Sequence, residues 1–333
     1  MAGEIVVITG ASAGVGRATV REFAKHQASI ALIARGRAGL EGAREEVERA
    51  GGKAIAFPID ISDPNLVDQA AKEVERLLGP IDIWINCAMV TVLAPTKEMS
   101  AEEYRRVTEV TYLGVVHGTL AALRHMLPRD RGCIVQVGSA LAYRSIPLQS
   151  AYCAAKHAIL GFTASLRSEL LHDKSNVHVT MVQLPALNTP QFSWAKNKMP
   201  RKPQPVPPIY QPEVAASAIY WAAHHPKREL YVGRSTVQAI VGNKIAPDLA
   251  DHVLAKKGYE AQQDDGPDDP LRPDNLWQPI NEDRGAHGRF DSRAKNGSIE
   301  LFAARHKRAL SLAAIGVIGA GLVAAKRRGK SEQ

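Results

Sequence analysis

The sequence predicts an α/β fold in which helices cover both faces of a doubly wound parallel sheet, giving an α/β/α arrangement in layers. Short apolar runs alternate with longer amphipathic stretches through the first half of the chain, as in repeated β-α units. The apolar runs are rich in Val and Ile and lack strict polar alternation, which is typical of strands buried on both faces. A glycine-rich turn joins the first apolar run directly to the first amphipathic stretch. These observations together favour a parallel sheet with crossover helices.

The boundaries of the elements follow from the same patterns. Strands are expected at residues 5–8, 30–34, 54–57, 81–85, 133–137 and 177–184. Helices are expected at residues 15–25, 40–50, 64–78, 101–126 and 151–172, with Asp63 and Ser100 as N-caps of two of them. A helix at 213–223, a short strand near 230–232 and a helical stretch at 235–257, interrupted by Pro247, complete the pattern.

The positive charge of the chain lies mostly at its C-terminal end. The chain has 333 residues, is 45% hydrophobic and carries a formal charge of +8. Residues 305–333 contain seven Lys or Arg and one acid, so +6 belongs to this tail and +2 to the other 304 residues. The main domain therefore offers no basic surface that would predict nucleic-acid binding. The three cysteines are scattered along the chain, which predicts reduced thiols rather than disulfides. The histidines show no HExxH motif and no Cys/His spacing typical of metal ligands, so no metal site is expected.

Composition divides the chain into three parts. Residues 1–257 form the main domain, and no signal peptide precedes its first strand. Within it, 186–212 is rich in proline and follows a strand, which predicts a substrate loop at the carboxyl end of the sheet. Residues 258–304 are rich in Asp, Pro and Gly, and are expected to be a mostly disordered linker that Trp277 and Ile280 could dock on the domain.

The tail from 305 to 333 predicts a membrane anchor for an otherwise cytoplasmic domain. Residues 309–325 carry no charge and lie between basic clusters. As a helix they would reach about 26 Å, slightly less than a ~30 Å hydrocarbon core, and basic flanks could cover the difference. Small residues recur on one face, which suits close packing of helices in lipid. The alternative is a soluble helix or a weakly surface-binding tail.

The glycine-rich turn predicts a dinucleotide site. It lies between the first strand and the first helix, where backbone N–H groups and the helix dipole can hold a pyrophosphate. The first glycine allows a tight turn, the second lets the backbone approach the phosphates, and the third lets the helix pack closely on the strand. The residues of this motif are Gly10, Ser12, Ala13, Gly14, Val15 and Gly16.

The end of the second strand favours NADP(H) over NAD(H). An NAD site usually has a carboxylate near this point to bind the ribose 2′-hydroxyl. Here the strand ends at Ala34 and is followed by Arg35. A guanidinium can pair with a 2′-phosphate through two hydrogen bonds, whereas the alternative is a solvated loop arginine.

A serine, a tyrosine and a lysine occur in an order and at a spacing that make them candidate catalytic residues. Ser139 follows a strand, Tyr152 comes 13 residues later, and Lys156 lies one helical turn beyond it on the same face. A Tyr and a Lys at this spacing are common on helix surfaces, so the pair alone would carry little weight. No Gly-x-Ser-x-Gly sequence surrounds Ser139, which argues against a hydrolase.

These motifs together resemble the short-chain dehydrogenase/reductase family over roughly residues 4–255. The segments that carry the resemblance are 9–16, 60–61, 86–88, Ser139, 152–156, 185–186 and 189–190. The resemblance implies a Rossmann-type catalytic domain, a nicotinamide cofactor, reversible carbonyl/alcohol chemistry and a homodimer or homotetramer.

The resemblance also implies roles for individual residues. Tyr152 would be the general acid/base, and Ser139 would hydrogen-bond the substrate oxygen. Lys156 would hold the nicotinamide ribose. Its ammonium, together with the positive nicotinamide ring, is expected to lower the pKa of Tyr152 from about 10 toward the operating pH. The remaining cofactor contacts would come from Asp60, Ile61, Asn86, Ala88, Pro185 and Thr189.

Two departures from the family pattern affect the site. The family often has an asparagine in the long helix before Ser139 that holds a proton-relay water, and Thr111 aligns with it here. Met89 follows the 86–88 turn, where the family usually has glycine. We interpret both changes as tolerated and keep Thr111 among the catalytic candidates.

The sequence therefore predicts an NADP(H)-dependent oxidoreductase that acts on a small-molecule carbonyl or alcohol, with an apolar substrate favoured if the tail binds membrane. The substrate pocket is expected between 140–147 and 188–210, with Tyr143 and Trp194 as candidate walls. The alternative is a non-catalytic NADP-binding scaffold on the same fold.

Overall fold

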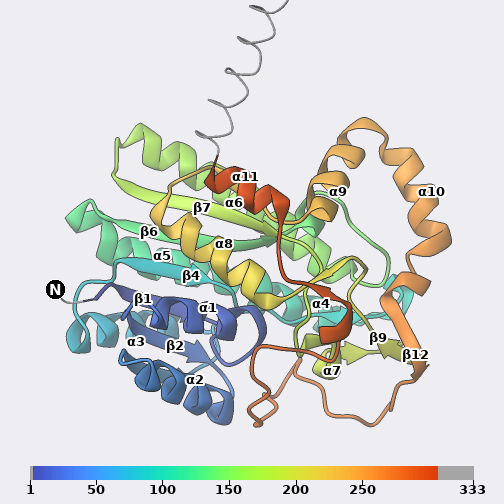
Figure 1. Cartoon of the computed structure of the whole chain (residues 1–333), viewed down its shortest axis with the longest axis horizontal. Coiled ribbons are helices and arrows are strands. Elements are labelled where there is room, and N and C mark those ends of the chain that lie inside the picture. Colours follow the sequence, from blue (N-terminus) through green and yellow to red (C-terminus); the bar gives the residue numbers. More distant parts are fainter. Residues whose placement is uncertain (1–2, 307–333) are drawn as a thin grey trace, which may run out of the picture.

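A seven-stranded parallel sheet forms the centre of the computed structural model, which describes residues 3–306 (Figure 1). Its strands follow the order β11-β7-β6-β4-β1-β2-β3. They are β1 (Ile5–Thr9), β2 (Ser29–Ala34), β3 (Lys53–Pro58), β4 (Ile83–Asn86), β6 (Gly132–Ser139), β7 (Val177–Leu184) and β11 (Glu229–Tyr231). The predicted Rossmann-type α/β class is confirmed, and the strands lie within a few residues of their expected positions.

The order of the strands places a ligand crevice beside β1. In register, Ile8 of β1 pairs with Leu32 of β2 on one side and with Ile85 of β4 on the other. The chain winds in one direction from β1 to β3 and in the other from β4 to β11. In open parallel sheets, ligands bind beyond the carboxyl ends of the strands at such a reversal.

Helices cover both faces of the sheet, and each face has its own core. One face carries α1 (Gly14–Ala24), α2 (Arg37–Arg49) and α8 (Pro212–His224), with Phe23 among its fully buried side chains. The other carries α3 (Pro64–Leu77), α5 (Gly114–Met126) and α6 (Ser150–His172), around Trp84. Figure 1 shows α1 and α8 side by side across the near face of the sheet.

The predicted helix starts are confirmed by their caps. Asp63 accepts hydrogen bonds from the first N–H groups of α3, and Ser100 forms a capping box with Glu103 at the start of α4 (Ala101–Val107). The helix expected over 101–126 is not uniform, because a π-helical turn at Thr108–Leu113 separates α4 from α5. Such turns often occur where a helix passes a functional site.

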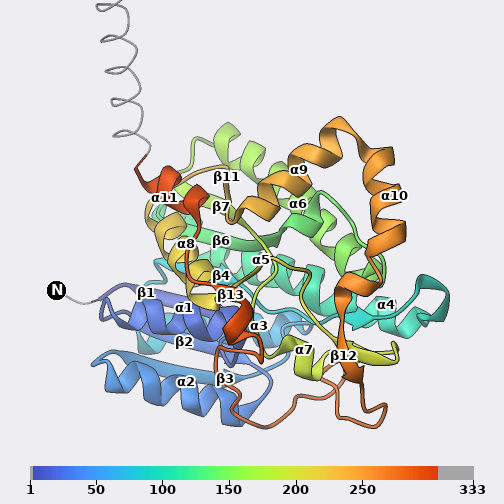
Figure 2. The ribbon, with the colours of Figure 1, turned by 45° about the vertical axis from the view of Figure 1, so that its right-hand side comes forward.

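Two helices after β11 project from the body of the domain. They are α9 (Arg234–Ile245) and α10 (Pro247–Lys257), which stand apart from the sheet in both views (Figure 2). The predicted break at Pro247 is confirmed. No residue of α10 is buried, and Ile245 and Leu249 are 77% and 65% exposed.

Residues 258–304 differ from the disordered linker that their composition predicts. Strand β12 (Gln263–Pro267) pairs with β9 (Arg201–Pro203), and β13 (Ala294–Lys295) pairs with β10 (Ile209–Tyr210). Both partner strands belong to the proline-rich loop. The segment then ends in α11 (Ile299–Arg305).

A few apolar anchors explain the order of this segment. Leu276, Phe290 and Leu301 are almost completely buried, whereas Trp277, one of the two expected docking residues, stays 45% exposed. Polar contacts to residues far away in the sequence add to these anchors. Amino-acid composition does not show that a single leucine is buried or that a carboxylate pairs with a distant residue. A prediction based on composition therefore gave disorder for this segment.

The predicted membrane anchor at 309–325 lies outside the described residues and stays a prediction. Within residues 3–306, no helix combines the length and the apolar character that crossing a membrane requires.

Candidate active site

One large cavity opens at the carboxyl ends of the strands, where the topology places a ligand crevice. Its volume is about 720 Å³, and it extends from the glycine turn of residues 10–16 to the projecting pair α9–α10. Ser139, Tyr152 and Lys156 all line it, as does Arg35. The structure therefore brings the glycine turn, Arg35 and the Ser-Tyr-Lys candidates into a single site.

The glycine turn has the geometry of a cradle that side chains would fill. Gly10 has a φ of +72°, and a Cβ atom there would lie 2.8 Å from the Cα of Ala88. A Cβ atom on Gly16 would lie 2.1 Å from the carbonyl oxygen of Gly10, so only glycine lets α1 begin so close to the turn. Ser12, Ala13, Gly14 and Val15 face the cavity. This surface fits a pyrophosphate bound at a helix N-terminus.

Arg35 lies at one end of the cavity, directly after β2. Its side chain is 17% exposed, and its Nη1 atom lies 3.9 Å from the carboxylate of Asp60. Burial lowers the pKa of Arg35, while Asp60 acts in the opposite direction. Asp60 also pairs with Arg106 of α4 and accepts a hydrogen bond from the Ser62 hydroxyl. Arg106 could not be singled out from local patterns, because its partner is 46 residues away in the sequence.

The Ser-Tyr-Lys group lies at the middle of the cavity. Ser139 is the last residue of β6, and its Oγ atom accepts a hydrogen bond from the N–H of Leu141 at 3.1 Å. Tyr152 and Lys156 lie one turn apart on α6, with the Lys156 Nζ atom 5.5 Å from the centre of the tyrosine ring. The ammonium of Lys156 donates a hydrogen bond to the carbonyl of Val137 at 2.8 Å. This bond holds the lysine against β6, and only 3% of the residue is exposed.

Burial dominates the titration of this group. It raises the pKa of Tyr152 well above 10, and the nearby Ser139 hydroxyl offsets only part of the shift. Burial also lowers the pKa of Lys156 to about 8 from 10.5. The expected lowering of the tyrosine pKa is therefore not seen in the protein alone, because desolvation is the largest contribution and it raises the pKa. Desolvation also raises the pKa of the half-buried Cys87 thiol, which lines the same cavity, to about 12.

Two predicted site residues have other partners in the structure. The Thr111 hydroxyl donates to the carbonyl of Val90 at 2.8 Å and accepts from the N–H of Val90 at 3.0 Å. The single O–H donor of Thr111 is therefore already used, and its hydroxyl oxygen can accept only one further hydrogen bond. The Asn86 side chain accepts from Trp84 and donates to Gln136 within the core, so it fixes β4 rather than facing the cavity.

Of the two residues predicted to form the wall of the substrate pocket, Trp194 lines the cavity and Tyr143 does not. Trp194 of α7 (Gln191–Trp194) lines the cavity, as do the cofactor candidates Ile61, Ala88, Pro185 and Thr189. Tyr143 does not line it. Its hydroxyl donates to the carboxylate of Glu229, and its ring packs edge-on against Tyr231.

Comparison with known proteins gives the family. The profile described as short chain dehydrogenase matches residues 4–199. The chain belongs to the short-chain dehydrogenase family.

Relatives of this short-chain dehydrogenase support the same assignment. The uncharacterized oxidoreductase YxnA of Bacillus subtilis is 31% identical over 323 residues, covering 96% of this chain and 89% of YxnA. A fatty acyl-CoA reductase of Acinetobacter baylyi is 30% identical over 77% of this chain and 84% of its own length. An alcohol dehydrogenase from Thermococcus sibiricus, solved as a complex with 5-hydroxy-NADP, has a TM-score of 0.60 at 26% identity and covers 69% of this chain and 95% of its own.

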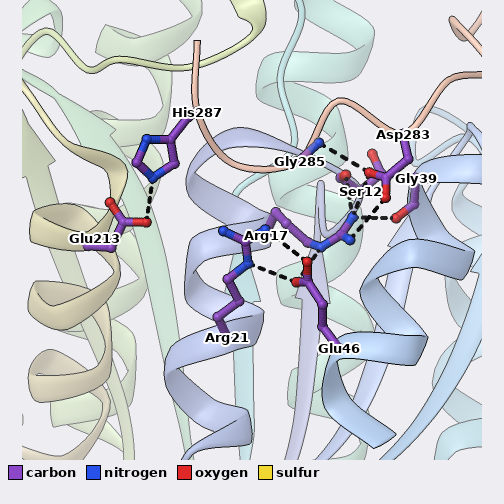
Figure 3. A network of polar contacts seen from close by, with 9 residues as sticks. All are labelled: Ser12, Arg17, Arg21, Gly39, Glu46, Glu213, Asp283, Gly285 and His287. Atoms are coloured by element: carbon purple, nitrogen blue, oxygen red, sulfur yellow. Dashed lines mark hydrogen bonds and ion pairs between the residues drawn. The ribbon is translucent and has the colours of Figure 1, made fainter. Parts of the chain in front are cut away.

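Beside the glycine turn, this dehydrogenase has a buried arginine that the sequence analysis did not single out. Arg17 of α1 is only 1% exposed and donates to the backbone carbonyls of Ser12 and Gly39 at 3.2 and 2.8 Å (Figure 3). Its Nε atom donates to Glu46 of α2 at 2.7 Å. It thus ties the glycine turn to α2. The sequence shows only that an arginine follows the last glycine of the motif. That this arginine is buried is seen only in the structure.

Glu46 provides a measure of how much this network contributes to stability. Burial alone would raise the pKa of Glu46, but hydrogen bonds and charge from Arg21 and Arg17 outweigh burial and lower it to about 2 from 4.5. The carboxylate therefore stabilises the fold above pH 4.5, and this contribution disappears as the pH falls toward 2.

We expect Glu46→Gln to lower the free energy of unfolding by about 1–2 kcal/mol at neutral pH. This is less than the full pKa shift would give, because Glu46 is partly exposed and solvent screens its ion pairs. The gap between variant and wild type should shrink as the pH falls from about 4.5 to about 2, because the carboxyl of the unfolded chain takes up a proton while that of the folded protein is still ionised. Urea titrations at several pH values measure this. Glu48→Gln on the same helix, which breaks an exposed pair with Arg44, should change stability by less than about 0.5 kcal/mol. A gap for Glu46→Gln that stays constant down to pH 2 would contradict the assignment.

Proposed function

We propose that the protein is an NADP(H)-dependent oxidoreductase that interconverts a carbonyl and an alcohol by hydride transfer. The observation that carries this proposal is the shared cavity. Ser139, Tyr152 and Lys156 line the same cavity as the glycine turn. A dinucleotide held by the turn would extend toward these three side chains.

Arg35 supports NADP(H) as the cofactor. It is the cation that lines the cavity at the end of β2, where an NAD site usually has a carboxylate. A guanidinium is suited to a 2′-phosphate because its planar N–H groups can donate two parallel hydrogen bonds. The structure from Thermococcus sibiricus, which contains an NADP analogue, is consistent with this choice. When bound, the reduced cofactor supplies the hydride.

The side chains have complementary roles in carbonyl reduction. Tyr152 donates its phenolic proton to the oxygen that becomes an alkoxide, and its raised pKa keeps that proton available at neutral pH. Ser139 donates a hydrogen bond to the same oxygen and stabilises its developing charge. Lys156, with a pKa of about 8, is mostly protonated at neutral pH and places a positive charge beside the tyrosine. It also holds the nicotinamide ribose, as the family resemblance implies.

The far end of the cavity favours an apolar substrate. The face of α10 that meets the cavity carries aliphatic side chains, among them Leu249, Val253 and Leu254, whereas α9 contributes small and polar residues. Arg144 is the cation at this end, and its guanidinium already pairs with Asp251 and donates to Asn243. Among the described residues Arg144 is the one charged side chain that lines this end, and Asp251 offsets its charge. We therefore infer an elongated, hydrocarbon-rich carbonyl compound.

A series of carbonyl compounds with increasing chain length tests the substrate class. We expect kcat/KM with NADPH to rise about threefold to fourfold for each added CH₂ until the cavity is filled, because burying one CH₂ contributes about 0.8 kcal/mol. The rate of NADPH oxidation measures this. Leu249→Ser should flatten the increase for the long members and leave the short ones unchanged. A preference for short, polar carbonyls would contradict the proposed class.

The assembly and the location of the protein stay predictions. A homodimer or homotetramer is expected from the family resemblance. The anchor at 309–325 would hold the domain near an apolar substrate dissolved in a membrane.

A further inference from the structure

A segment outside the family match follows the cofactor side of the cavity from end to end. We call residues 275–291 the strap. It begins beside Arg35, passes the glycine turn and ends beside the loop that contains Thr189. The profile of the family ends at residue 199, so nothing in the family pattern assigns these residues a role.

At its first end the strap positions Arg35. The Nη1 atom of Arg35 donates to the carbonyl of Trp277 at 3.0 Å, and its Nη2 atom donates to the carbonyl of Asn275. Arg106 donates to the carbonyl of Leu276 at 3.0 Å, and the Leu276 side chain is fully buried. The backbone of the strap is therefore anchored, and it fixes the plane of the guanidinium that would meet a 2′-phosphate.

In the middle, an ion pair attaches the strap to the network behind the glycine turn. Asp283 accepts two hydrogen bonds from Arg17, at 3.1 and 3.2 Å (Figure 3). Arg17 is the buried arginine that also binds the carbonyl of Ser12 in the turn. A two-point pair with a buried guanidinium is a strong, directional contact. Movement of Asp283 would thus be transmitted to the glycine turn.

The strap then contacts the glycine turn directly. The carbonyl of Gly285 accepts a hydrogen bond from the N–H of Gly14 at 3.0 Å, and Gly285 has a φ of +60°. The next residue, Ala286, is 1% exposed and packs between Ala18 of α1 and Ala216 of α8. The strap therefore fills the groove between these helices and forms the outer rim of the cradle.

At its last end the strap meets the nicotinamide side of the cavity. The N–H of Gly288 donates to the carbonyl of Asn188, and the N–H of Phe290 donates to its side-chain oxygen at 3.0 Å. His287 bridges Glu213 of α8 and Asp291, at 2.8 and 2.6 Å (Figure 3 shows the first of these contacts). Four separate attachments thus hold the strap along the length that a dinucleotide would occupy.

We propose that the strap completes the cofactor site: it positions Arg35 and the glycine turn, and it must loosen before the dinucleotide can leave. Asp283 acts through Arg17 and is a positioning residue. The inference rests on the proposed function, because the ligand is the NADP(H) of that site. Contacts that must open for release usually set the dissociation rate.

Asp283→Asn tests the attachment, since it keeps the shape of the side chain and removes its charge. We expect the dissociation rate of NADPH, measured by stopped-flow fluorescence, to rise about tenfold, as for the loss of a charge-assisted contact. The rate for NADH should rise less, about threefold, because the part of the effect that passes through Arg35 needs the 2′-phosphate. Glu73→Gln, which breaks an exposed pair with Arg76 on α3, is the matched control and should leave both rates unchanged.

Gly42→Ala provides a second test that keeps every charge. A Cβ atom on Gly42 of α2 would lie 2.0 Å from the Oδ2 atom of Asp283 and 2.7 Å from Arg17, so the pair must shift. Alanine favours the helix itself, so this variant should fold even if Asp283→Asn does not. We expect the same faster release of NADPH and the same fall in the preference for NADPH over NADH.

The outcomes separate the strap from the proposed function. Wild-type protein that binds NADPH, together with folded variants that release it at the wild-type rate, would overturn the strap and leave the proposed function in place. Equal acceleration for NADH and NADPH would overturn the positioning of Arg35. Wild-type protein that does not bind NADPH would overturn the proposed cofactor and the strap together.

Discussion

Tyr152→Phe is expected to lower kcat for carbonyl reduction by two to four orders of magnitude, the usual contribution of a positioned general acid. The substitution removes one oxygen atom and retains the ring, which lies against the ammonium of Lys156. Proton donation to the substrate oxygen is lost, whereas the cradle of residues 10–16 and the Arg35 end of the cavity are unchanged. NADPH binding should therefore stay within about threefold of wild type.

Steady-state kinetics and NADPH titration of the same preparation distinguish these effects. Tyr259→Phe is the matched control, because Tyr259 is 40% exposed and does not line the cavity. It should retain wild-type kcat. A Tyr152→Phe protein that keeps more than a tenth of the wild-type kcat would contradict the role that we assign to this tyrosine.

Arg35→Asp is expected to raise the Kd for NADPH about 100-fold, equivalent to about 2.7 kcal/mol. The variant removes the N–H groups suited to a 2′-phosphate and adds a carboxylate that would repel it. It also removes the hydrogen bonds to the strap at Asn275 and Trp277, so NADH should bind slightly less well than to wild type. The ratio of the two dissociation constants isolates the contribution of the 2′-phosphate.

Arg37→Asp is the control for overall charge. Arg37 lies two residues further along at the start of α2, is exposed, and does not line the cavity. It should change the ratio by less than about threefold. Equal effects of Arg35→Asp and Arg37→Asp would show that local charge, rather than the Arg35 guanidinium, sets the preference.

Local patterns predicted most of the sheet and its helices. Runs such as 177–184 are long, apolar and bounded by turns, and this one forms β7 over the same residues. Asp63 and Ser100 cap the helices that they were expected to cap, because a cap depends on residues only two or three positions away. The π-helical turn at 108–113 escaped prediction, since no local pattern separates it from an α-helix.

Those residues of the site that belong to short sequence motifs could be predicted. The glycine turn, Tyr152 and Lys156 are read from spacings of a few residues, and they line one cavity. Asn86 and Thr111 belong to such motifs as well, but their side chains bond to Gln136 and to Val90. The identity of a residue at a motif position does not tell which way its side chain points.

The strap and the outer wall of the cavity could not be predicted. Asp283 meets Arg17 across 266 positions of sequence, and Leu276 anchors a segment whose composition resembles disorder. The aliphatic side chains of α10 were visible in the sequence, but their position at the cavity depends on how α9 and α10 project from the sheet. Long-range placement of this kind is set by the folded domain as a whole.

Transfer of isotope from deuterated NADPH to a long-chain carbonyl compound, measured in a single turnover by mass spectrometry, tests the central claim most directly. We predict that the wild-type protein forms the deuterated alcohol, and that Tyr152→Phe binds the same labelled cofactor and forms the product at least 100-fold more slowly. Equal rates of deuterium transfer by the two proteins, or no transfer by wild-type protein with NADPH bound, would contradict the account.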